Sequence, residues 1–270
     1  NTGYDFAGLL CGSEGTLGLV TAVRLRLVAP TGPVATALVG FSSVAAAITA
    51  ASALRRSLAN VEAVELMLPA GLRLVQDAFE LPAPFRTPAA AVLLVEASAL
   101  DAPDTCLGDA VAGLEGVVDA AVGLDAPRRQ QLWRYREAHT DAISRLGPAH
   151  KLDVTLPAAA LPHFVDGVEA LVTRVAPEAQ TWCFGHAADG NVHVNVTGLS
   201  ASDERVDDAV LRAVADLGGS ISAEHGIGRA KRRWLHLARS GVEITAMRSI
   251  RAACDPDGIC NPGVLLPPEM

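Results

Sequence analysis

Short apolar segments alternate with longer amphipathic ones along most of this chain, and this alternation constrains the fold more than any other feature. The period of the apolar residues predicts strands at residues 34–41, 63–67, 89–97, 117–122, 151–156, 181–186, 192–196 and 220–223. It predicts helices at residues 43–58, 69–79, 102–114, 127–146, 158–175 and 203–217, and two more within residues 229–254. Successive β-α-β units with short strands favour an α+β fold. We therefore expect a ferredoxin-like plait, an antiparallel sheet with helices on one face.

The first 29 residues differ in character from the rest. They are rich in glycine and then alternate between apolar and polar residues from Leu19 to Leu27, which predicts a strand. Pro30-Thr31-Gly32-Pro33 then interrupts regular structure. We expect three parts: residues 1–29, a central domain at residues 30–240, and a C-terminal helix and tail at residues 241–270.

The composition excludes several classes of protein. A net charge of −8 argues against a nucleic-acid-binding surface, which needs a clustered basic face. The cysteines form no Cys-x-x-Cys pair, which argues against an iron–sulfur or cysteine-zinc site and favours the reducing cytoplasm. Apolar segments are too short to span a bilayer, and no signal peptide is evident. Abundant Ala, with Lys only at positions 151 and 231, is typical of a GC-rich bacterial genome.

The most specific segment is residues 185–195, Gly-His-Ala-Ala-Asp-Gly-Asn-Val-His-Val-Asn. Because side chains alternate along a strand, its valines share one face while His193 and Asn195 share the other. A tight turn at Asp-Gly would bring His186 back beside His193. Two imidazoles that meet across a hairpin form half of a metal site. Two solvated histidines at a turn explain the segment equally well.

A second segment places Glu224 directly before His225 at the end of an expected strand. Gly226 and Gly228 free the backbone there, so both side chains could face one cavity. Alone, the segment is better explained as an exposed turn. Beside the two histidines, however, Glu224 completes a set of two His and one carboxylate with open coordination positions. Such ligands suit Zn²⁺, Mn²⁺ and Fe²⁺ alike.

A third set lies on a helix and the strand after it. Arg136 and Thr140 are one helical turn apart, and Lys151 begins the strand. Arg136 and Lys151 could hold a carboxylate, although a surface ion pair of Arg136 with Glu137 or Asp141 is the simpler explanation. Four other histidines have no comparable neighbours and are expected to be structural or exposed: His139, His150, His163 and His236.

The fourth segment, Gly12 to Thr21, is a glycine-rich loop that runs into the expected strand. Its bare backbone N–H groups could approach a phosphate or the edge of a flavin. It is not a G-x-G-x-x-G sequence before a helix, so a Rossmann site is excluded.

Together these segments resemble the FAD-linked oxidase family of the vanillyl-alcohol oxidase superfamily. The nearer branch holds D-lactate dehydrogenases, D-2-hydroxyglutarate dehydrogenases and the glycolate oxidase flavoprotein subunit. The similarity runs from Gly3 to Pro267, and residues 255–263, Asp-Pro-Asp-Gly-Ile-Cys-Asn-Pro-Gly, are similar to the closing D-P-x-G-x-x-N-P-G motif of the family. Ala188 stands where the family usually has Gly, which would reshape the histidine loop if that position needs a positive φ.

The resemblance implies a role for each residue. The metal ligands of the family are matched by His186, His193 and Glu224, and its proposed general base by His225. Its substrate-binding positions are matched by Arg136, Thr140, Lys151 and Asn195. Flavin contacts are expected from Gly12, Ser13, Glu14, Gly15, Gly18, Val20 and Asn261. We expect the side chains of Lys151, His193 and Glu224 to open into one cavity.

The implied reaction is the FAD-dependent, metal-assisted oxidation of a small D-2-hydroxy acid to the 2-oxo acid. The N-terminal domain that holds the FAD pyrophosphate in this family is not in the chain. Residues 1–29 are therefore expected to be the C-terminal remnant of that domain, and the chain to be a substrate-binding fragment that is inactive and carries no FAD by itself. The electron acceptor, a homodimer and peripheral attachment of this cytoplasmic protein to the inner membrane are left open.

Two alternatives remain. The same histidines and Glu224 would serve a flavin-independent metallohydrolase, but the Gly12 to Gly18 loop and Asn261 would then have no explanation. The chain could also be a non-catalytic fragment that binds metal at most.

Overall fold

The computed structural model describes residues 2–268, so the ends of the predicted N-terminal and C-terminal parts, residue 1 and residues 269–270, lie outside the described residues. The strands are β1 Val34–Phe41, β2 Val61–Met67, β3 Ala91–Ser98, β4 Val117–Gly123, β5 Ala149–Thr155, β6 Gln180–His186 and β7 Asn191–Thr197. The helices are α1 Phe6–Leu10, α2 Val44–Ser57, α3 Pro69–Phe79, α4 Pro103–Ala112, α5 Ala126–Glu137, α6 His139–Ser144, α7 Leu161–Val175, α8 Arg205–Asp216, the 3₁₀ helix η1 Arg232–Leu237, and α9 Gly241–Cys254.

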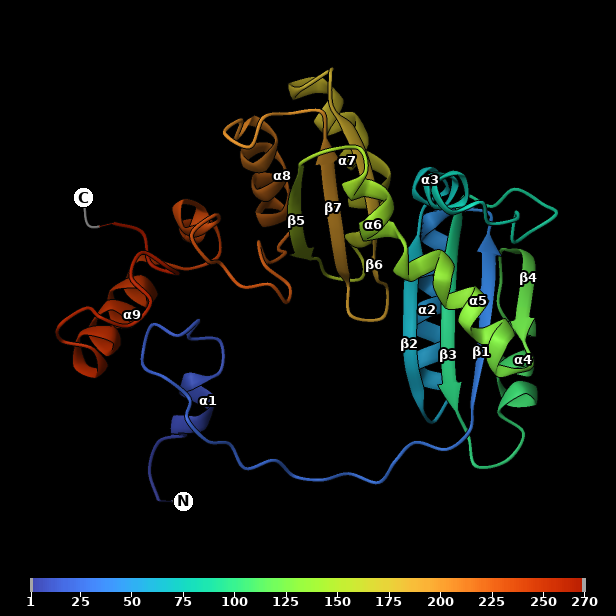
Figure 1. The fold of residues 1–270 in the computed structure, drawn as a ribbon, viewed down its shortest axis with the longest axis horizontal. Coiled ribbons are helices and arrows are strands. Elements are labelled where there is room, and N and C mark those ends of the chain that lie inside the picture. The colour runs from blue at the N-terminus through green and yellow to red at the C-terminus, as the bar shows by residue number, and fades with distance from the viewer. Residues whose placement is uncertain (1, 269–270) are drawn as a thin grey trace.

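The strands form one antiparallel sheet in the order β4-β1-β3-β2-β6-β7-β5, which confirms the predicted α+β plait (Figure 1). The plait occurs twice. In the first half, β1-α2-β2 and β3-α4-β4 give the order β4-β1-β3-β2. In the second half, β5-α7-β6 and β7-α8 give β6-β7-β5, and a single bridge between Thr155 and Ser220 replaces a fourth strand. The halves join where β2 pairs with β6 through residues 65–67.

Helices cover both faces of the sheet, so the expectation of helices on one face is incomplete. One face packs against α2, α4, α7 and α8, and the valines of β7 lie in that core. The other face of the first half packs against α3 and α5, and α6 packs against these two helices. The reason is visible in β3, where Leu93 lies in the first core and Leu94 in the second. A strand that is apolar on both sides needs cover on both sides.

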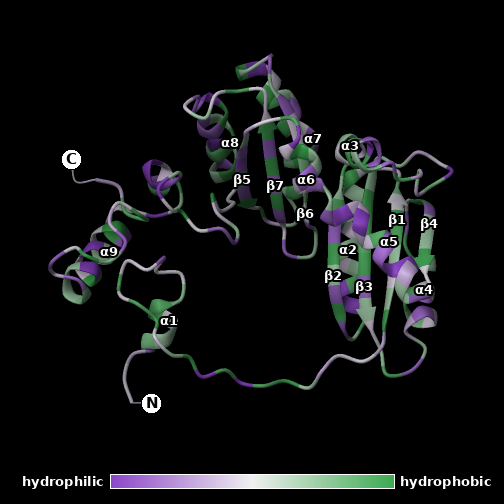
Figure 2. Cartoon of the chain, viewed as in Figure 1, coloured by the Kyte–Doolittle hydropathy of each residue, from purple (hydrophilic) through white to green (hydrophobic). Residues whose placement is uncertain are grey.

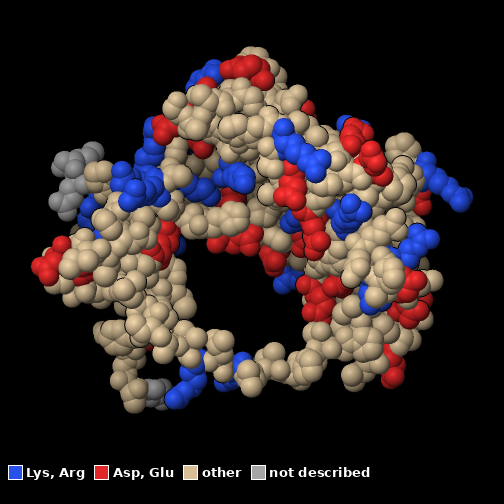
Figure 3. All heavy atoms as spheres, in the orientation of Figure 1, with Lys and Arg blue, Asp and Glu red and all other residues tan. Residues whose placement is uncertain are grey.

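The predicted strand at residues 19–27 is wrong. Residues 18–33 form an extended segment with no helix or strand (Figure 1), although hydrophobic residues recur along it (Figure 2). Leu19 is 89% exposed and Leu27 is 91% exposed. The alternation suits a strand, but no described strand lies beside the segment, and the space-filling view shows open space between it and the sheet (Figure 3).

Two smaller predictions also differ from the structure. The helix expected at residues 127–146 is two helices, α5 and α6, which meet at Ala138. The strand expected at residues 220–223 is reduced to the bridge at Ser220. Among the described residues, no helix combines the length and the apolar character needed to cross a bilayer.

Candidate metal and substrate site

Polar side chains from four neighbouring strands gather on one face of the sheet, where its two halves join. Glu65 on β2 is opposite His186 on β6. His193 on β7 lies opposite Phe184 of β6 and Asp153 of β5. Because paired residues share a face of the sheet, this register places Glu65, His186, His193 and Asp153 side by side. The all-valine face of β7 predicted from the sequence is turned away, into the core.

The three predicted metal ligands converge on one point. Nε2 of His186 lies 3.3 Å from Oε1 of Glu224, and Nε2 of His193 lies 3.4 Å from the same oxygen. The two Nε2 atoms are 3.3 Å apart. Two ligand atoms bound at about 2.1 Å to one tetrahedral ion lie roughly 3.4 Å apart. The donor set therefore fits a divalent metal without rearrangement.

Each of the two histidines faces a carboxylate on its other ring nitrogen. Nδ1 of His186 lies 2.8 Å from Oε1 of Glu65, and Nδ1 of His193 lies 3.5 Å from Oδ1 of Asp153. This Asp153 oxygen is buried and has no hydrogen-bond partner. A carboxylate at Nδ1 holds the proton there and leaves the lone pair of Nε2 for a metal, the usual arrangement around bound zinc. Because this oxygen of Asp153 has no other partner, it is available to the Nδ1 proton of His193, which supports the same fit.

Burial and neighbouring charges shift the pKa values of Glu65, His186 and His193. Burial raises the pKa of Glu65, but its bonds to His186 and Arg136 outweigh that effect and hold the pKa below its ordinary value. The hydrogen bond to Glu65 raises the pKa of His186 against the opposing effect of burial. Burial lowers the pKa of His193, although Asp153 opposes the change. The site therefore favours an ionised Glu65 and a neutral His193, the form that binds metals.

The loop that carries Glu224 and His225 is attached to the sheet by Asp153. Oδ2 of Asp153 accepts hydrogen bonds from the backbone N–H groups of Glu224 and His225, both at 2.8 Å, and of Ala223 at 3.2 Å. The ring of His225 stacks on that of His193, with 5.6 Å between centroids. As predicted from the glycines, Glu224 and His225 face the same cavity.

That cavity has a volume of about 290 Å³ and brings the predicted substrate residues together. Lys151, His193 and Glu224 open into it, as expected, and it is also lined by Arg136, Thr140, Asn195 and His225. The Nε of Arg136 donates to Oε2 of Glu65 at 2.7 Å. Arg136 therefore pairs with Glu65 and not, as the simpler explanation had it, with Glu137 or Asp141 on the surface. Its guanidinium lies over the ring of Phe184, 4.6 Å from the centroid.

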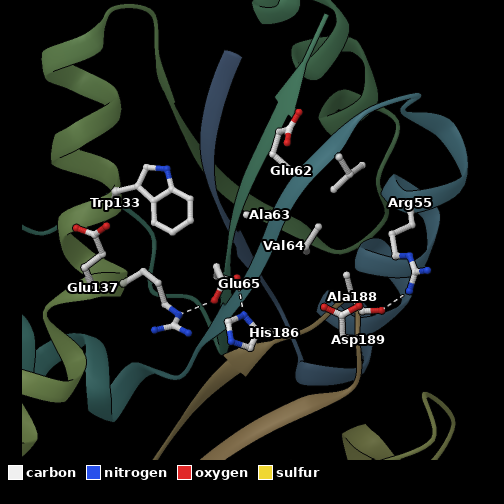
Figure 4. Close-up of a pocket in the computed structure, with 12 residues that line it drawn as sticks. Arg55, Glu62, Ala63, Val64, Glu65, Trp133, Glu137, His186, Ala188 and Asp189 are labelled. Atoms are coloured by element: carbon white, nitrogen blue, oxygen red, sulfur yellow. Dashed lines mark hydrogen bonds and ion pairs between the residues drawn. The ribbon is translucent and has the colours of Figure 1, made fainter. Parts of the chain in front are cut away.

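A second cavity, of about 520 Å³, adjoins the first, and Arg136 lines both. Figure 4 shows Glu65 and His186 in contact in this second cavity, at the junction of β2 and β6. Trp133 and Glu137 of α5 lie along one side, and Asp189 of the hairpin turn lies along another.

Several residues of the site were not predicted from the sequence. Glu65 is a buried acid between the apolar residues Val64 and Leu66 of β2, a pattern that indicates a role for its carboxylate. Asp153 shared the polar face of Lys151 but was not assigned a role. His139, expected to be structural or exposed, is buried, and its Nε2 has no hydrogen-bond partner.

Ala188 introduces no backbone strain into the histidine hairpin. The positive φ in this turn belongs to Gly190, at 74°, and Ala188 does not share that conformation. A Cβ at position 190 would lie 2.4 Å from the backbone oxygen of Leu156. The turn therefore needs its glycine at position 190 and tolerates Ala at 188.

The predicted flavin contacts are only partly brought together. Gly12, Gly15 and Gly18 have positive φ, and a Cβ at Gly12 or Gly18 would meet no atom within 4 Å. Ser13 is buried, whereas Val20 is 63% exposed in the extended segment. The side chain of Asn261 donates to the backbone oxygen of Glu14 at 2.6 Å. The carboxylate of Glu14 is turned away from the loop, toward the backbone of residues 227–228.

Comparisons with known proteins identify relatives of this chain. A D-2-hydroxyglutarate dehydrogenase of Xanthomonas citri pv. viticola is 35% identical over 98% of this chain and 58% of its own length. The mitochondrial D-2-hydroxyglutarate dehydrogenase of Bos taurus is 34% identical over 99% of the chain and 50% of its own length. Glycolate oxidase subunit GlcD of Escherichia coli is 32% identical over 98% of this chain and 54% of its own length. The chain thus spans about half the length of the curated relatives it matches.

Solved structures share the fold of this chain, and a family model identifies its family. An alkyldihydroxyacetonephosphate synthase shares the fold with a TM-score of 0.63 at 16% identity, over 97% of this chain and 50% of its own. A 4-ethylphenol oxidase from Gulosibacter chungangensis has a TM-score of 0.63 at 14% identity, over 88% of this chain and 55% of its own. The model of the FAD linked oxidases, C-terminal domain, matches residues 33–265. The chain therefore belongs to the family of FAD linked oxidases, as a C-terminal domain of that family.

Proposed function

We propose that the full-length gene product oxidises a small D-2-hydroxy acid to the corresponding 2-oxo acid, with FAD as the oxidant and a divalent metal at His186, His193 and Glu224. The observation that carries the proposal is the convergence of these ligands beside His225, in the cavity that Arg136 and Lys151 also line. The relatives named above are D-2-hydroxyglutarate dehydrogenases and a glycolate oxidase subunit.

The residues that line the cavity would have different roles in binding the substrate. Lys151 and Arg136 would bind substrate carboxylate, Lys151 as a point charge and Arg136 through the guanidinium nitrogens not engaged by Glu65. Asn195 and Thr140 would offer hydrogen bonds from the same cavity. A bound Zn²⁺, Mn²⁺ or Fe²⁺ would lower the pKa of the substrate hydroxyl, as it does for bound water.

His225 would accept the hydroxyl proton. Its ring is 60% exposed on the cavity, and its Nδ1 and Nε2 lie 3.8 Å from Asp153 and 3.9 Å from Glu224, so neither nitrogen has a short carboxylate contact. A base that is free and next to the metal ligands can receive the proton as the hydride leaves C2. FAD would supply the redox chemistry by accepting that hydride.

The flavin would be held mostly outside this chain. Gly12, Ser13, Gly15 and Gly18 offer open backbone, and Val20 and Asn261 would add side-chain contacts. The remaining contacts, including those to the pyrophosphate, would come from an FAD-binding domain. The chain alone would hold too few parts of this long ligand to offset the freedom lost on binding.

The test is a turnover screen of D-2-hydroxy acids with a dye acceptor, on full-length protein whose flavin and metal contents are measured. We expect a yellow, metal-containing protein that reduces the dye with D-2-hydroxy acids. A colourless protein that hydrolyses substrates with bound metal would instead establish the metallohydrolase alternative.

A further inference from the structure

The loop that carries Glu224 and His225 lacks regular structure. Residues 221–228 form no helix or strand. Two side-chain carboxylates, from distant parts of the chain, take up five of its backbone N–H groups. Asp153 holds those of residues 223–225, and Glu14 holds those of Ile227 and Gly228, both at 2.7 Å. Hydrogen bonds to an ionised acceptor are about twice as strong as neutral ones.

Glu14 reaches this loop from an unusual backbone conformation. Its φ is +52°, in the left-handed region that a glutamate rarely adopts. The side chain of Asn261, itself at φ +37°, donates to the backbone oxygen of Glu14 and so holds the backbone of Glu14 in place. On the loop side, a Cβ at Gly226 would lie 2.8 Å from Oε1 of Glu14, so only glycine permits the approach. Strained residues of this kind cluster at functional sites.

The position of the His225 ring depends on this backbone. Its nearest carboxylate contacts, at 3.8 and 3.9 Å, are too long to be hydrogen bonds. The ring is more than half exposed and stacks on His193 on one side. Its position is therefore set by where the loop places Cα of residue 225.

We propose that Glu14 is a positioning residue for the reaction: its carboxylate fixes the His225 loop to the Gly12 to Gly18 loop. The base and the flavin contacts are then held as one unit. The role given to His225 rests on the proposed function. The role given to Glu14 replaces the flavin contact predicted from the sequence, because its two oxygens are already engaged by Ile227 and Gly228.

Glu14→Gln is the sharpest test, since glutamine keeps the shape but has one acceptor oxygen for two N–H donors. Asp119→Asn is the matched control, because that carboxylate also accepts from two backbone N–H groups, of Arg86 and Thr87, in another loop. Amide hydrogen exchange of full-length protein, followed by mass spectrometry, should show exchange at residues 227–228 faster by about tenfold in Glu14→Gln. It should be unchanged there in Asp119→Asn.

Steady-state kinetics provide the second readout. Misplacement by about 1 Å can cost about 100-fold in rate, so kcat should fall strongly in Glu14→Gln while KM and the flavin and metal contents stay near wild type. Glu14→Asp, which keeps both oxygens on a shorter side chain, should be intermediate and serves if the glutamine variant does not fold.

Two results would overturn the inference. One is unchanged exchange at residues 227–228 in folded Glu14 variants. The other is loss of flavin with normal exchange, which would return Glu14 to a flavin contact. If the wild-type protein oxidises no 2-hydroxy acid, the proposed function fails, but the exchange comparison still decides whether Glu14 holds the loop.

Discussion

His139 allows a quantitative prediction about the packing behind the site. It lies in α6, is 1% exposed, and packs on Phe184 with 5.0 Å between ring centroids. Its Nδ1 lies 3.2 Å from the backbone oxygen of Arg136, and its Nε2 has no partner. Burial, with the positive charge of Arg136, lowers the pKa of His139 from 6.5 to about 4. The folded protein therefore holds this ring neutral.

The sign of the effect follows from the two pKa values. As pH falls below 6.5, the unfolded chain binds a proton at this position and the folded protein does not, so stability decreases until the pH reaches about 4. A pKa unit corresponds to about 1.4 kcal/mol, so the total loss is about 3 kcal/mol. His139→Phe keeps a planar ring and removes the titration.

Urea unfolding of the chain at a series of pH values between about 7 and 4 measures this difference. Wild type should lose about 3 kcal/mol more than His139→Phe over that interval. His163→Gln, at an exposed position of α7, should follow the wild type. Parallel curves for wild type and His139→Phe would show that His139 does not titrate with a lowered pKa in the folded protein.

Three further predictions concern the site. Glu65→Gln should weaken metal binding by about 10- to 100-fold in a chelator competition, because His186 exchanges a carboxylate partner for a neutral amide. Glu62→Gln should not, because the carboxylate of Glu62 accepts from Ser98 instead. Arg136→Lys should raise KM more than it lowers kcat, since lysine keeps the charge but loses the fork; an unchanged KM would exclude a substrate contact. Burial raises the pKa of Asp153, but the hydrogen bonds from the backbone N–H groups of Glu224 and His225 outweigh burial and lower the pKa. The folded protein therefore loses stability as the pH falls below about 4. Asp153→Asn should flatten that part of the acid-unfolding curve.

The sequence predicted what local periodicity encodes. The alternation of residues 191–197 and the turn before it place His186 beside His193, and the structure has this hairpin. Glu65 could not be predicted in the same way, because it meets His186 only through the pairing of β2 with β6, 121 residues apart. Which strands become neighbours is a tertiary property that no local pattern states.

The errors have similar causes. The alternation at residues 19–27 specifies a strand, but a strand needs a neighbour to take up its backbone hydrogen bonds, and the described part of the chain supplies none. The break at Ala138 follows no glycine or proline. It coincides with the packing of His139 against Phe184 and beside Gly71, where a Cβ would lie 2.8 Å from the ring. Tertiary packing therefore overrides a continuous helical pattern here.

His186→Ala separates the metal site of this chain from the flavin, which we propose is held mostly by another domain. Full-length wild type and variant would be purified with bound flavin, analysed for metal, and mixed anaerobically with a D-2-hydroxy acid that the wild type turns over. We expect the visible flavin absorption of the wild type to bleach, while the variant keeps its flavin, lacks the metal and is not reduced. Reduction of the variant at the wild-type rate, or loss of flavin together with the metal, would contradict it.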